Sequence, residues 1–364
     1  MAASIAWGQE GAPKAVLLDT AVVSTQSPFY QGWPTLAIKP DGELLLVCSG
    51  GREAHVCPFG RVDLFRSRDG GKTWTWPQTL LDGPLDDRDA GLLVTPKGSL
   101  LVTTFTSLAY EPILAAAEKK GNWKEADLRA WQSARDRISP QQRKKDLGVW
   151  MIRSTDGGIT WSARQDCLVN SPHGPIALGN GDLLYAGKDL WRDGWVGVCH
   201  STDDGVSWKK LAAIPVREGD DAKNYHELHA IDAGGVILVH IRNHNKANER
   251  ETLQSESTDG GKTWSTPHAI GVWGLPSHLL KLKDGRILMS YGHRRKPFGN
   301  QARLSSDKGK TWSQPILLST DGVTGDLGYP STVERNDGSL STAWYEVRPG
   351  NPKAVLRIVH WKLP

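Results

Sequence analysis

A short motif that recurs five times constrains the fold of this chain more than any other feature. The motif has the form Ser-x-Asp-x-Gly-x-Thr/Ser-Trp. Its carboxylate can accept backbone N–H groups within a tight turn, and its glycine can supply a positive φ there. Its tryptophan leads into the next strand and offers a large flat surface for packing against a neighbouring sheet. The five box motifs are SRDGGKTW (67–74), STDGGITW (154–161), STDDGVSW (201–208), STDGGKTW (257–264) and SSDKGKTW (305–312).

A second repeat, of apolar hairpins with a glycine turn, lies between the box motifs. Each hairpin predicts strands one and two of a four-stranded sheet, and each box turn joins strands three and four. Four strands repeated about every 50 residues are typical of a β-propeller. We therefore predict an all-β fold, a six-bladed β-propeller that forms one domain over residues 1–364. The six hairpin turns are centred on Gly42, Gly98, Gly181, Gly235, Gly285 and Gly338.

The two ends of the chain are predicted to meet in the sixth blade. The last hairpin is followed by a single strand, 354–361, and by no further box motif. The missing outer strand can come from segment 14–24, which precedes the first hairpin. Such pairing closes the ring and leaves no open sheet edge.

Segment 110–147 interrupts this pattern. It is rich in Ala, Lys, Glu, Arg and Gln, which predicts two or three short helices, broken at Gly121 and at Ser139–Pro140. Removing it brings the first interval between box motifs into line with the others. We therefore predict a helical insertion between strands two and three of blade two. On the face of the propeller opposite the box turns, the insertion should form a wall or lid of a pocket, or else an oligomer contact.

Composition excludes several classes of partner. The net charge of +4 is small for 364 residues, so neither nucleic acid nor a membrane surface is expected. No apolar run is long enough to span a bilayer. The N-terminus lacks the charged and apolar regions of a signal peptide, so we expect a secreted or periplasmic protein whose signal has been removed, in preference to a cytoplasmic one.

The cysteines predict neither a metal site nor a redox site, because none of them has CxxC spacing. Cys48 and Cys57 could meet across a hairpin, but buried free thiols are the favoured interpretation for all four. We expect no metal and no cofactor. The four cysteines are Cys48, Cys57, Cys167 and Cys199.

Chemistry is expected on the face opposite the box turns, because the first strands of the blades begin there, close to the axis. Counting back eight or nine residues from each hairpin glycine gives Trp33, Asp89, His173, Glu227, Pro276 and Tyr329 at this mouth. The strand ends and loops that follow add Arg52, Glu53, His55, Arg242, His293, Arg294, Arg295 and Tyr345. A purely structural channel would not require acids, arginines, histidines and tyrosines from every blade.

With these residues placed, the chain resembles the sialidase superfamily over nearly its whole length, apart from the insertion. The resemblance implies a tyrosine nucleophile paired with a glutamate base. Tyr329, in GYPSTVE, stands where that tyrosine is expected, and Glu227, in YHELHAID, stands where its partner is expected. A base is needed because a neutral phenol is a poor nucleophile.

The resemblance also implies three arginines that grip a substrate carboxylate. Arg242, in HIRNHN, matches the second arginine, and Arg294 or Arg295, in YGHRRKPFG, matches the third. The first is absent, because Trp33 occupies its place in QGWPTL and could instead stack on a sugar face. Two further mouth residues, Arg52 and His173, complete the residues expected to contact substrate.

The general acid departs from the family pattern. The family places an aspartate in the loop after strand two of blade one, where this chain has GGREAHVCPFGR. Three residues could replace that aspartate: His55 and Glu53 from this loop, and Asp89 from the next blade. For His55, a hydrogen-bonded surface histidine is an equally good interpretation.

The prediction is therefore an exo-acting glycoside hydrolase of the sialidase type, which cleaves a terminal acidic sugar from an oligosaccharide or glycoconjugate. One alternative is a glycosidase for a uronic, 2-keto-3-deoxy or deoxy sugar. Another is a carbohydrate-binding propeller without catalysis, and a protein-interaction scaffold is disfavoured by the polar mouth. A metal-assisted enzyme is also disfavoured, because His226 and His229 should lie on opposite faces of a strand.

Overall fold

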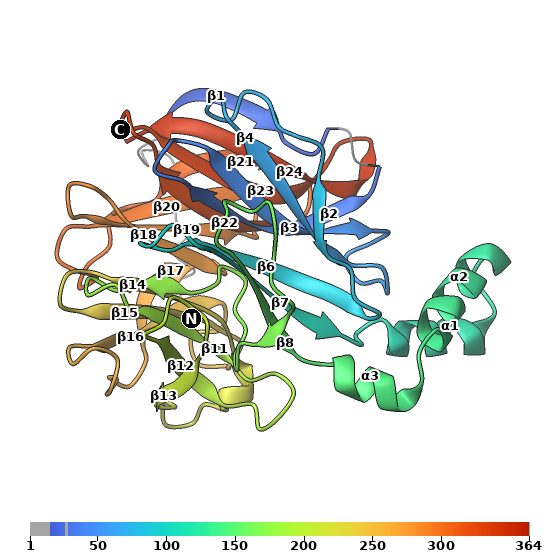
Figure 1. The fold of residues 1–364 in the computed structure, drawn as a ribbon. Coiled ribbons are helices and arrows are strands. Elements are labelled where there is room, and N and C mark those ends of the chain that lie inside the picture. Colours follow the sequence, from blue (N-terminus) through green and yellow to red (C-terminus); the bar gives the residue numbers. More distant parts are fainter. Residues whose placement is uncertain (1–14, 26–27, 364) are drawn as a thin grey trace, which may run out of the picture.

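The computed structural model describes residues 15–25 and 28–363. Lys14, the first residue of the predicted closing strand, and most of the N-terminal stretch considered for a signal peptide lie outside these ranges. The described residues form six four-stranded antiparallel sheets arranged as a β-propeller (Figure 1). The predicted six-bladed, all-β fold with a helical insertion is confirmed.

Blades one to three follow one another along the chain, each with its strands in sequence order. Blade one consists of β2 (Tyr30–Ile38), β3 (Leu44–Arg52), β4 (Arg61–Ser67) and β5 (Gln78–Leu81). Blade two consists of β6 (Asp86–Val94), β7 (Leu100–Ser107), β8 (Val149–Ser154) and β9 (Gln165–Asp166). Blade three consists of β10 (Ile176–Ala177), β11 (Leu183–Lys188), β12 (Val196–Ser201) and β13 (Lys209–Ala213).

Blades four to six complete the ring. Blade four consists of β14 (Tyr225–Asp232), β15 (Ile237–Asn243), β16 (Glu251–Ser257) and β17 (His268–Trp273), and the one-turn helix η1 (Ala222–Asn224) precedes it. Blade five consists of β18 (Ser277–Lys281), β19 (Ile287–His293), β20 (Phe298–Ser305) and β21 (Ile316–Gly322). Blade six consists of β22 (Leu327–Glu334), β23 (Leu340–Arg348), β24 (Asn351–Lys362) and β1 (Val16–Val22).

Blade six closes the ring as the two chain ends predicted. Strand β1 pairs antiparallel with β24, and Val16 lies opposite Lys362 while Val22 lies opposite Arg357. The first strand of each blade faces the axis, so that β2 contacts both β6 and β22. Residues from the beginning and the end of the sequence therefore meet at the mouth of one channel.

The box turns join strands three and four, as expected. In the fourth blade's turn, the Asp259 carboxylate accepts hydrogen bonds from the backbone N–H and the hydroxyl of Thr263, and Gly261 has a φ of 88°. These bonds hold the pKa of Asp259 below its usual range. The box tryptophans pack into the apolar clusters between neighbouring blades, as Trp264 does between blades three and four. The turns therefore fasten each sheet to the next.

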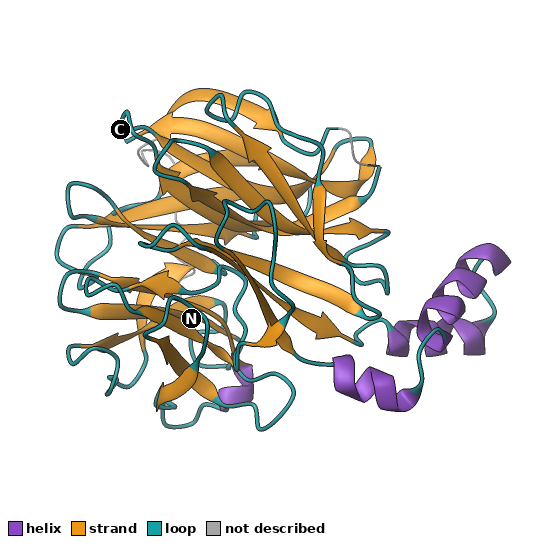
Figure 2. Ribbon diagram, viewed as in Figure 1, coloured by secondary structure: helices purple, strands orange, loops and turns teal. Residues whose placement is uncertain are grey.

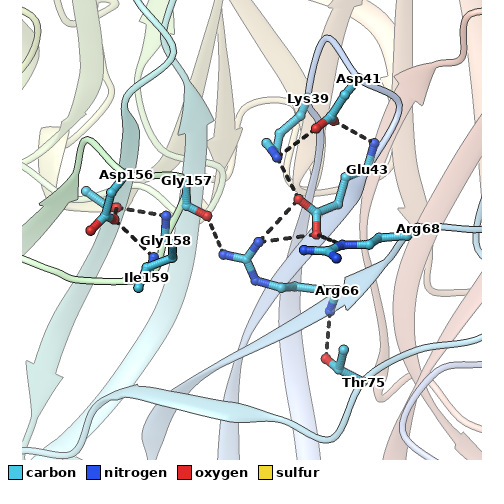
Figure 3. A network of polar contacts seen from close by, with 11 residues as sticks. Lys39, Asp41, Glu43, Arg66, Arg68, Thr75, Asp156, Gly157, Gly158 and Ile159 are labelled. Carbon is cyan, nitrogen blue, oxygen red and sulfur yellow. Dashed lines mark hydrogen bonds and ion pairs between the residues drawn. The ribbon is translucent and has the colours of Figure 1, made fainter.

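Polar contacts between blades reinforce the box face. Figure 3 shows Arg66 of blade one between Glu43 of its own blade and the box turn of blade two. Its Nη1 lies 3.2 Å from Glu43 Oε2, and its Nη2 donates to the Gly157 carbonyl at 2.5 Å. Lys39 and Arg68 also donate to Glu43, so this buried carboxylate is fully paired.

The insertion forms three helices between β7 and β8: α1 (Glu111–Lys120), α2 (Glu125–Asp136) and α3 (Pro140–Asp146). They end or begin where predicted, since Gly121 caps α1 with a φ of 60° and the Ser139 hydroxyl caps α3. The helices project from one side of the propeller (Figure 2). The Trp131 indole N–H donates to Glu53 at 2.9 Å, so the insertion contacts the loop that follows β3 on the mouth face.

All four cysteines are buried free thiols. No helix in residues 15–25 and 28–363 is long and apolar enough to cross a membrane.

Candidate active site

Four side chains enter the mouth from β-bulges at the start of innermost strands. Trp33, Asp89, Glu227 and Tyr329 have φ values of 52°, 49°, 44° and 54°, which non-glycine residues rarely adopt. The strand register shifts at each of these positions. Such strain persists where surrounding structure holds it in place, and it concentrates at functional sites. Counting from the hairpin glycines found the four positions but carried no signal for their backbone conformation.

Tyr329 and Glu227 meet directly, although 102 residues separate them in the sequence. The Tyr329 hydroxyl donates to Glu227 Oε1 at 2.5 Å. Arg242 Nη1 donates to Glu227 Oε2 at 2.5 Å and to the Tyr329 hydroxyl at 3.0 Å. Blades four and six therefore supply a tyrosine, a carboxylate and a guanidinium that are in mutual contact.

The electrostatics of this group suit transfer of a proton from the phenol to the carboxylate. Burial would raise the pKa of Glu227, but the charge and hydrogen bonds of Arg242 hold it below its usual value. Burial and the Glu227 charge raise the pKa of Tyr329 well above its usual value. The phenol is therefore neutral and the carboxylate is ionised, so the carboxylate can accept the phenolic proton as the phenol oxygen attacks.

The structure distinguishes the two candidates for the third arginine. The Arg294 guanidinium lies 5.5 Å from the centre of the Tyr329 ring, and its Nε donates to the Leu327 carbonyl at 2.9 Å. The Arg295 guanidinium instead stacks on Trp273 at 3.7 Å in an exposed position, and no contact of Arg295 with Tyr329 is found among the described residues. Arg294 therefore lies beside Tyr329, whereas Arg295 does not.

A cavity opens between blades four and five, beside this group. Its volume is about 380 Å³, in the lower part of the range for small-molecule sites. Arg242 and Arg294 line it together with Arg250, a cation that the sequence reasoning missed. The cavity therefore presents three guanidinium groups and the Glu249 carboxylate, and two of these arginines, Arg242 and Arg294, also lie against Tyr329.

Trp33 lies beneath the mouth and is only 1% exposed. The Arg88 guanidinium covers its ring at 4.4 Å, and the Tyr329 ring packs against it with centroids 6.4 Å apart. In this structure a sugar would therefore meet Arg88 before the indole. Arg88 was also missed by the sequence reasoning, although it stands beside Asp89 in DDRDAG.

Arg52 lies behind the mouth and is completely buried. Both of its Nη atoms pair with the Asp86 carboxylate, at 2.5 Å and 3.0 Å. Its Nη2 also donates to the carbonyl of His55 at 3.2 Å, so Arg52 holds the loop after β3 in place. The structure thus surrounds Arg52 with protein groups and leaves Arg88 nearer the opening.

The candidates for the proton donor are in different environments. Asp89 is buried close to the Glu227 charge, and these two influences raise its pKa to about 7. Glu53 accepts the Trp131 indole N–H of the insertion. His55 is exposed at the rim, where its Nδ1 lies 2.9 Å from Asp326 of blade six. Asp326 was not among the predicted residues, because nothing in its local sequence separates it from other loop aspartates.

His173 lies deeper in the channel than expected for a residue at an open mouth. Its buried ring packs against His229 and His278, with centroids 5.3 Å and 5.0 Å apart, and lies 6.5 Å from the Tyr329 ring. Burial lowers the pKa of His173 well below its usual value. The ring is therefore neutral and lies beneath the tyrosine.

The histidines of blade four are found in separate environments. His226 packs against His244 with ring centroids 5.0 Å apart, whereas His229 belongs to the channel cluster. In the part of the chain that the structure describes, no three or more His, Cys, Asp or Glu side chains are arranged to hold a metal ion.

Comparisons with known proteins agree with this architecture. A family described as the BNR repeat-like domain matches residues 119–342. The sialidase of Bacteroides fragilis is 26% identical over 293 residues, which are 71% of this chain and 49% of that protein. The sialidase of Micromonospora viridifaciens is 24% identical over 335 residues, which are 88% of this chain and 40% of that protein. The chain thus spans half or less of the length of these curated relatives.

A solved structure is similar over almost the whole chain. It is a protein of unknown function from Dyadobacter fermentans, with a TM-score of 0.78 and 23% sequence identity. The similarity covers 96% of this chain and all of that one, so the propeller fold is shared from end to end. The chain belongs to the BNR repeat-like domain family, as a divergent member of the sialidase superfamily of six-bladed propellers.

Proposed function

We propose that the protein is an exo-acting glycoside hydrolase of the sialidase type, with Tyr329 as nucleophile and Glu227 as its base. The observation that carries this proposal is the 2.5 Å hydrogen bond from the Tyr329 hydroxyl to the Glu227 carboxylate, at the end of the axis. A carbohydrate-binding propeller without catalysis would have no need of this pair.

The reaction would pass through a glycosyl intermediate on Tyr329. As the Tyr329 oxygen attacks the anomeric carbon, Glu227 takes the phenolic proton and the bond to the leaving oxygen breaks. A neutral phenol and its base also avoid bringing a charged nucleophile against an anionic sugar. Water then releases the sugar from the tyrosine, and the proton returns from Glu227 to the phenol.

An acidic terminal sugar fits the charges at the mouth. Arg242, Arg250 and Arg294 line the cavity and outnumber the Glu249 carboxylate there, and a guanidinium matches a carboxylate in charge and in geometry. The volume of about 380 Å³ suits one sugar residue better than a long chain, which favours attack at chain ends.

The sugar need not be N-acetylneuraminic acid. Trp33 occupies the place where the family has its first arginine, and Arg52 is fully engaged with Asp86. The Arg88 guanidinium, which covers the indole at 4.4 Å and lies 3.6 Å from the Asp86 carboxylate, is the cation that stands at this place instead. Uronic and 2-keto-3-deoxy sugars, which also carry a carboxylate, are therefore the alternative substrates, followed by deoxy sugars.

The test is a screen of aryl glycosides of sialic, 2-keto-3-deoxy, uronic and deoxy sugars with the wild-type protein and with Tyr329→Phe. We expect turnover of an acidic sugar, a loss of kcat of about 10³-fold or more in the variant, and unchanged sugar binding by calorimetry.

The matched control is Tyr185→Phe. This variant removes another buried phenol, whose hydroxyl is bound to the Ser171 carbonyl in blade three. It should lower the unfolding free energy and leave kcat unchanged. Turnover that survives in Tyr329→Phe would rule out the tyrosine mechanism.

A further inference from the structure

A histidine–carboxylate pair crosses the junction of blades one and six at the rim of the mouth. His55 follows β3, and Asp326 immediately precedes β22. Their contact, His55 Nδ1 to Asp326 Oδ1, measures 2.9 Å and joins residues 271 positions apart. It therefore exists only because the ring closes.

The Asp326 carboxylate is fixed by more than the histidine. The Tyr30 hydroxyl donates to both of its oxygens at 3.0 Å, and the Tyr345 hydroxyl donates to Oδ1 at 3.1 Å. Burial would raise the pKa of Asp326, but the hydrogen bonds from His55 and the tyrosines hold it below its usual value. The group is therefore an ionised carboxylate, which can only accept hydrogen bonds.

This contact determines which ring nitrogen of His55 carries a proton. The Tyr30 hydroxyl also lies 3.0 Å from Nδ1, but it donates its proton to Asp326. Because Asp326 cannot donate, the proton of the bond between Nδ1 and Asp326 belongs to Nδ1, and Nε2 is left for other chemistry. The His55 side chain is 47% exposed, and its Nε2 receives no hydrogen bond from any described residue. A histidine oriented in this way by a carboxylate can give a proton and take one back.

The pair also lies beside the proposed nucleophile. The Trp33 ring is edge-on to His55, with centroids 5.0 Å apart, and edge-on to Tyr329, at 6.4 Å. The Tyr345 ring lies 5.9 Å from the Tyr329 ring. His55 therefore stands at the exposed rim and packs on the same indole, Trp33, that packs against Tyr329.

The two competing donors are placed differently. Asp89 is only 7% exposed, in the interior of the mouth where the Glu227 charge acts on it, whereas His55 lies at the exposed rim. Glu53 already accepts the Trp131 indole N–H at 2.9 Å. His55 differs from Glu53 in that its orienting partner is an ionised carboxylate, which leaves the exposed Nε2 of the ring for proton transfer.

We propose that His55 is the proton donor and acceptor of the reaction, and that Asp326 is the residue that positions it. This inference rests on the proposed function. Protonated His55 gives its Nε2 proton to the leaving oxygen as Tyr329 attacks, and the leaving group departs as an alcohol. Neutral His55 then takes a proton from water, whose oxygen attacks the anomeric carbon and displaces Tyr329.

The test compares leaving groups, using the 4-nitrophenyl glycoside and the methyl glycoside of the sugar that the screen identifies. An activated leaving group needs no proton, so His55→Ala should retain kcat/KM for the 4-nitrophenyl glycoside within about tenfold. It should lose about 10²- to 10⁴-fold for the methyl glycoside. Asp326→Asn should show the same selectivity with a smaller loss.

The matched control is His200→Ala. His200 also pairs with an aspartate, Asp182, at 3.2 Å, but this pair lies at the hairpin turn of blade three, on the other face. The control should change neither rate. An equal loss for both glycosides in His55→Ala, or a selective loss in Asp89→Asn instead, would overturn the proposal.

A second measurement does not depend on turnover. Nitrogen NMR of the imidazole should find the proton on Nδ1 when His55 of the wild-type protein is neutral. In Asp326→Asn the tautomer with the proton on Nε2 should become more populated. A proton on Nε2 in the wild type would refute the pair. If the wild type cleaves no glycoside at all, the proposed function fails, whereas this readout still tests the pair.

Discussion

In the box turns, each aspartate accepts hydrogen bonds from residues within four positions of itself, whereas the carboxylates at the mouth find partners in other strands or other blades. Asp203, for example, bonds Ser201 and Ser207 of its own turn. Glu227 instead forms hydrogen bonds with Arg242 and Tyr329. Its own backbone is held at a φ of 44°, which non-glycine residues rarely adopt. The same side-chain chemistry therefore stabilises the box face, whereas at the mouth it is maintained at the cost of backbone strain.

The largest effect should come from Glu227→Gln. Losing the base that accepts the phenolic proton should lower kcat by about 10²- to 10⁴-fold, measured on the aryl glycoside that the screen identifies. Glu256→Gln is the matched control, because Glu256 lies in the same blade but bonds Ser265 near the box turn. If both variants lost activity equally, the contrast between the faces would fail.

The two adjacent arginines of blade five provide a sharper comparison. Arg294→Ala should lower kcat/KM for an acidic glycoside by about 10- to 100-fold, the value of hydrogen bonds to a charged group. Arg295→Ala should change it less than about threefold, because an exposed cation stacked on Trp273 does not face Tyr329. A larger loss in Arg295→Ala would reverse the assignment of the third arginine.

Asp89→Asn should change how the free energy of unfolding depends on pH, because Asp89 is buried as a neutral acid at the mouth. Folded Asp89 keeps its proton up to a pKa of about 7, whereas an unfolded aspartate loses it near pH ~4. The folded state thus binds more protons between these values, so this residue's contribution to stability is lost as pH rises through them.

Asparagine removes that dependence. The variant should gain stability relative to wild type by up to about 1.4 kcal/mol per pH unit across the window, measured by urea unfolding at pH 4.5 and pH 7.5. Asp127→Asn, an exposed change on α2, should show no such slope. An equal difference at both pH values would argue against a protonated Asp89.

The smallest effect should come from a single box turn. Asp203→Ala removes the acceptor for Ser207, and it should lower the free energy of unfolding by about 1 kcal/mol while kcat is unchanged. Thr202→Ala, at the exposed neighbouring position, should leave both quantities unchanged. A loss of turnover in Asp203→Ala would show that the two faces are coupled.

Much of the architecture could be read from local patterns. The hairpin glycines and box motifs predicted the six sheets, and the lone strand 354–361 predicted closure by the N-terminal segment. The positions of Glu227 and Tyr329 followed from the same repeat. Such features follow from short-range turn chemistry and strand alternation, which the order of residues specifies directly.

The partners of the mouth residues could not be predicted in this way. Local sequence does not tell that Arg52 turns to Asp86, that Arg88 covers Trp33, or that Asp326 reaches His55. These contacts depend on β-bulges, which insert an extra residue and so redirect the neighbouring side chains. They also depend on blades that meet only when the ring closes. The order of residues therefore determined the ring and the positions around its mouth, whereas packing between blades determined which of these residues touch.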